Sequence, residues 1–267
     1  MRRAFPISNG MKKGQKIIIG NWKMWPETRE VAKKTFTAIR KIADSEKKVL
    51  IVICPPAVFL SDLSKLAARA KQVYVGAQDV SMQTKGAFTG EVNANMLADA
   101  GLGYCIVGHS ERRAMGESDE VVNRKLHAIL STHMTAVLCV GEKTRDNEGV
   151  YLSHLKNQIK NSLARVERRR LDSIIIAYEP VWTIGRADFK AMNAHEIHES
   201  VIFIKKSLVE IYGSNVASLV PVLYGGSIDV ENARDILHRG ETQGLLIGRT
   251  SQSAKDFGEI VKIANQA

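Results

Sequence analysis

Short apolar runs alternate along this chain with longer segments in which apolar residues recur every three or four positions. The first pattern predicts buried strands and the second predicts amphipathic helices. The strand pattern occurs in eight segments: Lys16–Gly20, Val49–Cys54, Val73–Ala77, Tyr104–Val107, Thr135–Val140, Ser173–Tyr178, Leu219–Leu223 and Gly244–Ile247. The helix pattern also occurs in eight: Glu30–Ala43, Phe59–Arg69, Asn93–Ala100, Asp119–Ser131, Tyr151–Arg165, Ala194–Tyr212, Glu231–His238 and Ala254–Ala264. A helix is therefore predicted after every strand.

The strand segments are mostly unbroken apolar runs, as parallel strands with helices on both faces require. Right-handed crossovers repeated over eight units allow such a sheet to close. We therefore predict an α/β fold, a (β/α)8 barrel, in one domain over residues 16–267. The alternative is an open doubly wound sheet, but no G-x-G-x-x-G turn follows the first strand. Residues 1–15 are expected to be an amino-terminal extension, of which Met1–Gly10 is dispensable.

The composition is that of an ordinary globular protein, with 45% hydrophobic and 25% charged residues in a chain of 267. The odd number of cysteines, Cys54, Cys105 and Cys139, cannot form a complete disulfide framework, and each lies in a strand segment. No apolar stretch reaches the length of a membrane span, and the first ten residues lack the apolar core of a signal peptide. We expect reduced thiols, a cytoplasmic location and no membrane partner.

The chain is basic, with 38 Lys and Arg against 28 Asp and Glu and a formal net charge of +10. This charge suits an anionic partner, but a basic solvated surface is the favoured interpretation. The basic runs are short, Lys12-Lys13, Lys47-Lys48 and Arg168–Arg170, and no aromatic residues interleave with them to stack on bases. We expect no nucleic-acid partner. No cluster has the spacing of metal ligands, so we expect neither a metal nor another cofactor.

Polar residues stand directly after the predicted strands, and in a barrel this is where chemistry takes place, because the loops that follow the strands converge at one end. The residues in these positions are Asn21, Lys23, Gln78, His109, Glu111, Glu142, Glu179, Ser227, Gly248 and Arg249. The order of the sequence thus predicts one site at the carboxyl end of the barrel.

Six short motifs carry most of these residues: Gly20–Met24, Gly86–Glu91, Gly108–Arg113, Cys139–Glu142, Ala177–Trp182 and Tyr224–Ser227. In order and spacing they resemble the signatures of triosephosphate isomerases, over about Ile17 to Ile263. The resemblance implies a glycolytic and gluconeogenic enzyme without cofactor. Such an enzyme interconverts dihydroxyacetone phosphate and D-glyceraldehyde 3-phosphate.

The chemistry of this reaction explains two of the residues. Moving a carbonyl along a carbon chain requires a base for a carbon-bound proton and donors for the enediolate oxygens. Glu179, followed by Pro180-Val181-Trp182, matches the family's base. His109 matches its neutral electrophile, and the segment from Ser110 to Arg113 is expected to begin a short helix directly behind it.

Lys23 is the expected fixed positive charge. By resemblance, Asn21 orients Lys23 and contacts the substrate, and Glu111 pairs with Lys23. From local spacing alone Lys23 could equally be a surface lysine.

Phosphate binding is expected from backbone N–H groups in the last two loops, as is common in barrels of this kind. Ser227, Gly248 and Arg249 lie in these loops. The resemblance adds Gly185 in a mobile loop. It also implies a homodimer, in which the loop Gln78–Glu91 enters the neighbouring subunit and places Thr89 near its Asn21 and Lys23.

Three positions depart from the family pattern. Thr183–Lys190 replaces the usual Ala-Ile-Gly-Thr-Gly-Lys, with the difference concentrated in Arg186–Lys190. Arg249 replaces a glycine, and Trp25 replaces an asparagine. These departures leave two alternatives open: an isomerase of a longer phosphorylated ketose, such as a tetrulose phosphate, and a barrel that only binds an anionic partner.

Overall fold

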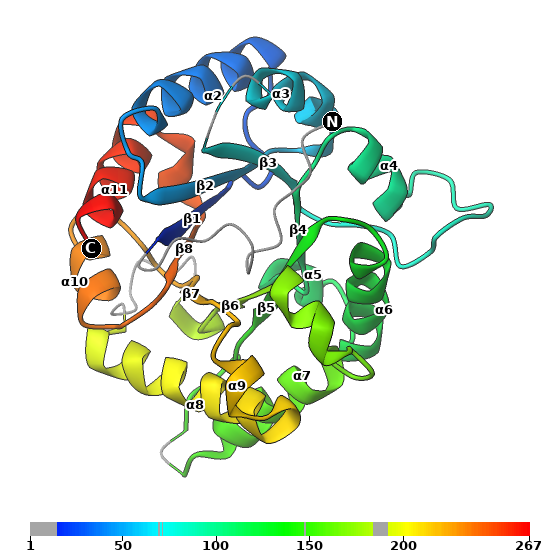
Figure 1. Ribbon diagram of the computed structural model, residues 1–267, viewed down its shortest axis with the longest axis vertical. Coiled ribbons are helices and arrows are strands. Elements are labelled where there is room, and N and C mark those ends of the chain that lie inside the picture. Colours follow the sequence, from blue (N-terminus) through cyan, green and yellow to red (C-terminus); the bar gives the residue numbers. More distant parts are fainter. Residues whose placement is uncertain (1–14, 69, 71, 147, 184–191) are drawn as a thin grey trace.

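Eight parallel strands close into a barrel in the order β1 to β8, with the helices around it (Figure 1). The structure, a computed structural model, describes residues 15–68, 70, 72–146, 148–183 and 192–267. The strands are β1 Lys16–Asn21, β2 Val49–Cys54, β3 Val73–Ala77, β4 Tyr104–Val107, β5 Thr135–Val140, β6 Ile174–Tyr178, β7 Val222–Tyr224 and β8 Gly244–Ile247. The predicted α/β barrel is confirmed.

Helices follow the strands and cover the outside of the barrel. The α-helices are α2 Arg29–Ala43, α3 Leu60–Ala67, α4 Ala94–Asp99, α5 Ser110–Ala114, α6 Asp119–Leu130, α7 Val150–Ser162, α8 Ala194–Tyr212, α9 Ser214–Ala217, α10 Ala233–His238 and α11 Ala254–Gln266. Short 3-10 turns are η1 Ala57–Phe59, η2 Arg168–Ser173, η3 Val181–Thr183 and η4 Arg249–Gln252. Several helices begin at a side chain that caps a free backbone N–H, namely Thr28, Asn93, Ser118, Asn193 and Ser253.

The barrel closes where β1 pairs with β8. Ile17 lies beside Gly244 on this side and beside Leu50 of β2 on the other. A side chain at position 244 would overlap the backbone carbonyl of Ile17. Glycine is therefore required at this point of closure.

Strand side chains alternate between two apolar clusters. Those that point inward fill the barrel: Ile17, Ile19, Val52, Cys54, Tyr104, Ile106, Val137, Cys139, Ile175, Ala177, Leu223 and Leu246. The neighbouring strand residues, such as Ile18, Ile51 and Leu138, pack outward with the helices. The barrel interior is thus solid, and polar chemistry is left to the ends of the strands.

Several predicted boundaries differ from the structure by one or two residues, and two are wrong by three. The seventh strand begins at Val222 rather than Leu219, because residues 214–217 form the unpredicted helix α9 and Leu219 is 58% exposed. The helix predicted to run to Arg165 ends at Ser162, and Arg165 has a left-handed φ of 60°. A left-handed residue cannot continue a right-handed helix.

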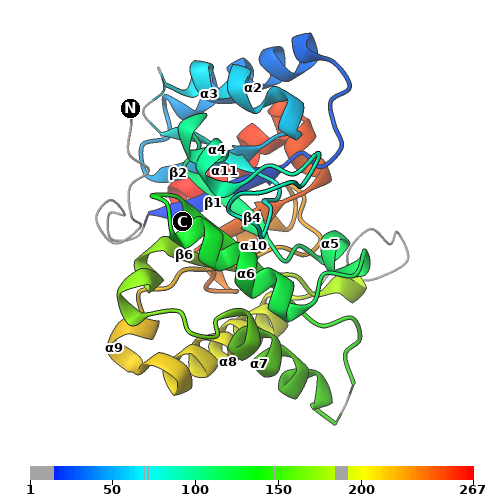
Figure 2. The same cartoon turned by 90° about the vertical axis from the view of Figure 1, so that its right-hand side faces the viewer.

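The two ends of the barrel carry different elements. Helix α5, which follows β4, lies at the carboxyl end, and α9, which precedes β7, lies at the opposite end (Figure 2).

Gly185, the altered segment Arg186–Lys190 and the extension Met1–Gly10 lie outside the described residues. Within the described part of the chain, every helix is too short or too polar to cross a membrane.

Candidate active site

Glu179 follows β6 and is almost fully buried at the carboxyl end of the barrel, with 2% of its surface exposed. Its backbone N–H donates to the carbonyl of Val140, 2.8 Å away. A Cβ at Gly141 would overlap the Glu179 carbonyl, and a Cβ at Gly225 would lie 3.1 Å from Glu179 Cγ. The two glycines therefore leave the space in which this glutamate sits.

His109 faces the Glu179 carboxylate. His109 Nε2 lies 3.3 Å from Glu179 Oε1, and the backbone N–H of Ser110 donates to Glu179 Oε2 at 2.8 Å. On the other side of the ring, Nδ1 accepts a hydrogen bond from the N–H of Glu111 at 3.2 Å, so His109 caps α5. Because Nδ1 accepts, a neutral ring carries its proton on Nε2, toward Glu179. The short helix expected after His109 is confirmed.

Lys23 is held from both its backbone and its side chain. Its φ of 54° is in the left-handed region, and its N–H donates to Asn21 Oδ1 at 3.0 Å. Gln78 Nε2 donates to the Lys23 carbonyl at 2.8 Å. The ammonium pairs with Glu111 Oε1 at 2.5 Å. Asn21, Lys23 and Glu111 therefore form one connected group beside His109.

The last two loops lie next to Lys23. A Cβ built on Gly248 would be 3.9 Å from Lys23 Nζ, and Thr250 Oγ1 ties the two loops together by donating to the Ile228 carbonyl at 2.6 Å. The backbone N–H groups of Ser227 and Arg249 donate to no group among the described residues. Free N–H groups at the start of the 3-10 turn η4 suit an anion.

The family model described as triosephosphate isomerase matches residues 16–264. The chain belongs to the triosephosphate isomerase family. A triosephosphate isomerase of Fusobacterium nucleatum is 40% identical over 252 residues, which cover 93% of this chain and 98% of the relative. One of Francisella philomiragia is 37% identical over 254 residues, covering 94% and 98%.

A crystal structure of triosephosphate isomerase from Bartonella henselae has the same fold. It superposes with a TM-score of 0.81 at 31% sequence identity, over 93% of this chain and 98% of that chain. These matches account for the order and spacing of the six motifs.

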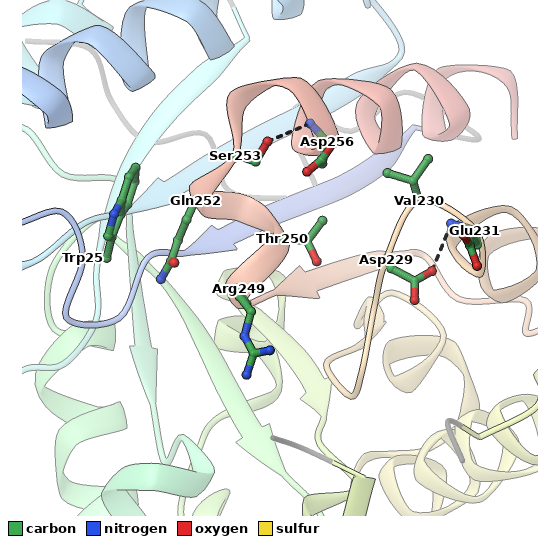
Figure 3. A pocket seen from close by; sticks show the side chains of 9 residues that line it. All are labelled: Trp25, Asp229, Val230, Glu231, Arg249, Thr250, Gln252, Ser253 and Asp256. Atoms are coloured by element: carbon green, nitrogen blue, oxygen red, sulfur yellow. Dashed lines mark hydrogen bonds between the residues drawn. The ribbon is translucent and has the colours of Figure 1, made fainter. Parts of the chain in front are cut away.

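Arg249, where the triosephosphate isomerase pattern has glycine, has an exposed side chain without an ion pair among the described residues. It lines an open cavity of about 690 Å³ together with Trp25, Asp229 and Asp256. Its guanidinium points away from Asp256 (Figure 3). Glu179 and His109 do not line this cavity.

Two buried neighbours of Glu179 were given no role from the sequence, although Glu142 is among the polar residues that follow the predicted strands. The Cys139 thiol lies in the barrel interior next to the carboxylate, and burial together with the negative charge of Glu179 raises its pKa. Glu142 accepts from the Tyr178 hydroxyl at 2.8 Å and from Trp182 Nε1 at 2.9 Å, and so anchors both sides of Glu179 along the chain. Burial first, and then Glu142, raise the pKa of Tyr178. The position of both residues at a strand end was the available signal.

The structure thus brings Glu179, His109, Glu111, Lys23 and Asn21 together and places Ser227, Gly248 and Arg249 in the adjoining turns. No group of three His, Cys, Asp or Glu side chains suited to a metal occurs within the described ranges.

Proposed function

We propose that this chain interconverts dihydroxyacetone phosphate and D-glyceraldehyde 3-phosphate through an enediolate. The observation that supports this most is the pairing of the buried Glu179 carboxylate with His109 Nε2 at 3.3 Å. One group is an acceptor and the other a donor, and a proton transfer next to a carbonyl needs both. We infer the substrate from the chain's membership of the triosephosphate isomerase family.

In the proposed mechanism Glu179 removes a proton from C1 of dihydroxyacetone phosphate. The electron pair of that C–H bond forms the C1–C2 double bond, and the former carbonyl pair stays on the oxygen of C2. The proton of the C1 hydroxyl passes to the oxygen of C2, with His109 Nε2 as the relay, and the protonated Glu179 returns its own proton to C2. The C1 oxygen is then the carbonyl of the aldehyde. One carboxylate serves both steps because the two carbons are neighbours.

His109 and Lys23 stabilise the charge that develops on oxygen. His109 Nε2–H donates to the oxygen of C2, since Nδ1 is already occupied by the N–H of Glu111. The Lys23 ammonium adds a positive charge. The hydrogen bond from the Lys23 backbone N–H to Asn21 Oδ1 holds this residue in place. Donors arranged before the reaction starts require no reorganisation in the transition state.

The phosphate group is proposed to bind at the free N–H groups of Ser227 and Arg249, beside Gly248. Lys23 Nζ lies close to Gly248, so the same cation attracts the phosphate dianion. Gly185 is proposed as a further donor from its family position.

A homodimer is proposed through the segment Gln78–Glu91, which projects away from the barrel (Figure 1). Apolar side chains are exposed on and around it: Met24 95%, Phe88 46%, Met96 58% and Met115 77%. Neighbouring exposed apolar residues mark interaction surfaces, and twofold dimers are the commonest symmetric assembly. A cytoplasmic location is proposed because all three cysteines are free and buried.

A coupled assay on the purified chain tests the function. We expect turnover of D-glyceraldehyde 3-phosphate with a kcat/KM at least a hundredfold above that for a tetrulose phosphate of the matching configuration. Equal or greater turnover of the four-carbon compound would replace this proposal with the longer-ketose alternative. No turnover of either compound would contradict both.

A further inference from the structure

A second cavity, of about 320 Å³, opens at the end of the barrel opposite Glu179. Its walls are the carboxyl end of α6, residues 127–131, and the segment 165–170 that leads into β6. We call it the basal pocket. Because α6 runs antiparallel to the strands, its carboxyl end lies at the amino ends of the strands.

The basal pocket is lined with arginines. Arg165, Arg169 and Arg170 come from one wall, and His127 lies on the other. Glu167 is the one carboxylate among the described lining residues, and it pairs with Arg169. The arginines outnumber the carboxylate, which leaves a net positive charge for a ligand to neutralise.

Arg165 is the free cation of the group. It makes no hydrogen bond or ion pair with the described residues and is exposed. It also has a φ of 60°, a conformation that a non-glycine residue adopts rarely and at a cost in free energy. Backbone of this kind is concentrated at ligand sites, where the surrounding structure holds it.

Two other side chains that line the pocket are already oriented. Arg170 Nη2 donates to the carbonyls of Leu130 and Thr132, which fixes its guanidinium at the carboxyl end of α6. His127 Nε2 lies 3.0 Å from the Ala164 carbonyl. A carbonyl only accepts, so Nε2 carries a proton and the ring plane is set.

The floor of the basal pocket is apolar, formed by the buried side chains of Leu130 and Val166. No aromatic side chain lines it, so it offers no platform for stacking a base. Its volume is at the lower end of the range for small-molecule sites. The paired N–H donors of an arginine guanidinium match the spacing of phosphoryl oxygens, and the apolar floor suits a short carbon skeleton.

We propose that the basal pocket binds a small phosphomonoester, with its phosphoryl group between Arg165 and Arg169 and its carbon skeleton on Leu130 and Val166. This site is separate from the proposed active site and does not depend on it. It assigns a role to Arg169 and Arg170 of the run Arg168–Arg170 and to part of the excess positive charge, which the isomerase reaction leaves unexplained.

The test is a titration of the isotope-labelled chain with inorganic phosphate and with glycerol 1-phosphate, each at constant ionic strength, followed by NMR of the backbone amides. We expect saturable shifts of residues 127–131 and 165–170, with glycerol 1-phosphate binding the more tightly of the two. The amides of Ser227 and Arg249 report the proposed active site in the same spectra, so the failure of one site is distinguishable from that of the other.

Arg165→Asn removes the free guanidinium, and asparagine tolerates the left-handed φ, so the fold is retained. We expect this variant to bind at the basal pocket at least fivefold more weakly. Arg239→Ser is the matched control, because it removes an exposed arginine outside the pocket and should bind as the wild type does.

Three results would overturn the proposal. The first is a linear drift of the basal amides, equal in all three proteins, which indicates a general ionic effect. The second is inorganic phosphate binding as tightly as glycerol 1-phosphate, which removes the carbon skeleton from the site. The third is Arg165-dependent binding of an oligothymidylate more tightly than glycerol 1-phosphate, which makes the pocket part of a nucleic-acid surface.

Discussion

His109 Nε2 and Glu179 Oε1 lie 3.3 Å apart in the structure, and the second oxygen of Glu179 accepts the Ser110 N–H at 2.8 Å. Both oxygens of the carboxylate are therefore occupied. A substrate carbonyl that accepts a hydrogen bond from His109 Nε2 must displace Glu179 from that nitrogen. We infer that substrate binding moves the carboxylate away from His109 and Ser110 and toward the carbon whose proton it removes.

His109→Gln is expected to lower kcat by about 10²-fold to 10³-fold, with a smaller change in KM, because one preorganised donor to the enediolate is lost. Steady-state kinetics with D-glyceraldehyde 3-phosphate measure this change. His133→Gln, at an exposed histidine outside the site, should have wild-type kinetics. A His109→Gln variant with unchanged kcat would assign the electrophilic role to Lys23.

Thr89→Asp is expected to give monomers of low activity. Thr89 is exposed in the single chain and belongs to the segment proposed to enter the neighbouring subunit, where a carboxylate would be buried. Sedimentation velocity and kcat are the measurements, with Ser214→Asp at the opposite end of the barrel as control. A Thr89→Asp protein that sediments as a dimer would contradict the proposed interface.

Arg249→Gly is expected to raise KM less than about tenfold, or about 1.4 kcal/mol. The exposed guanidinium makes no ion pair among the described residues, so it acts on the dianion at long range and its effect should shrink as salt is added. KM at two ionic strengths measures this. A rise beyond a hundredfold, about 2.7 kcal/mol, would indicate a direct contact with the phosphate.

Lys125→Met is expected to destabilise the fold by about 3 kcal/mol, because it leaves two partly buried carboxylates without their main partner. Lys125 is 4% exposed, and its ammonium lies 2.6 Å from Asp79 and 2.5 Å from Glu117. Lys156→Met breaks an exposed pair with Glu210 and should cost less than about 1 kcal/mol. Urea unfolding of the two variants compares these costs, and equal midpoints would contradict the account of the buried network.

The sequence predicted the fold well where a segment contains its own boundary signals. β4 has the bounds that were predicted, and Gly103 and Gly108 flank it. The start of β7 was misplaced because the apolar Leu219 and Val220 look like strand residues. In the structure they belong to the connection between α9 and β7, and the strand begins only after Pro221. The left-handed bend at Arg165 had no signal, since glycine or asparagine usually marks such a bend.

The site could be predicted to the level of its residues but not of its contacts. Strand ends and motif order pointed to Glu179, His109 and Lys23. The hydrogen bond from Ser110 to Glu179 and the thiol of Cys139 beside the same carboxylate depend on barrel register and side-chain rotamers. A one-dimensional pattern does not specify either.

The most direct test of the central claim is hydrogen exchange during catalysis in D2O, followed by proton NMR with dihydroxyacetone phosphate as substrate. If Glu179 carries the proton through an enediolate, the aldehyde product of the wild-type chain should contain solvent deuterium at C2. Glu179→Gln should reduce both turnover and deuterium incorporation by about 10²-fold to 10⁴-fold, with little change in KM. A Glu179→Gln protein that turns over and exchanges at the wild-type rate, or a wild-type product free of deuterium, would contradict the account.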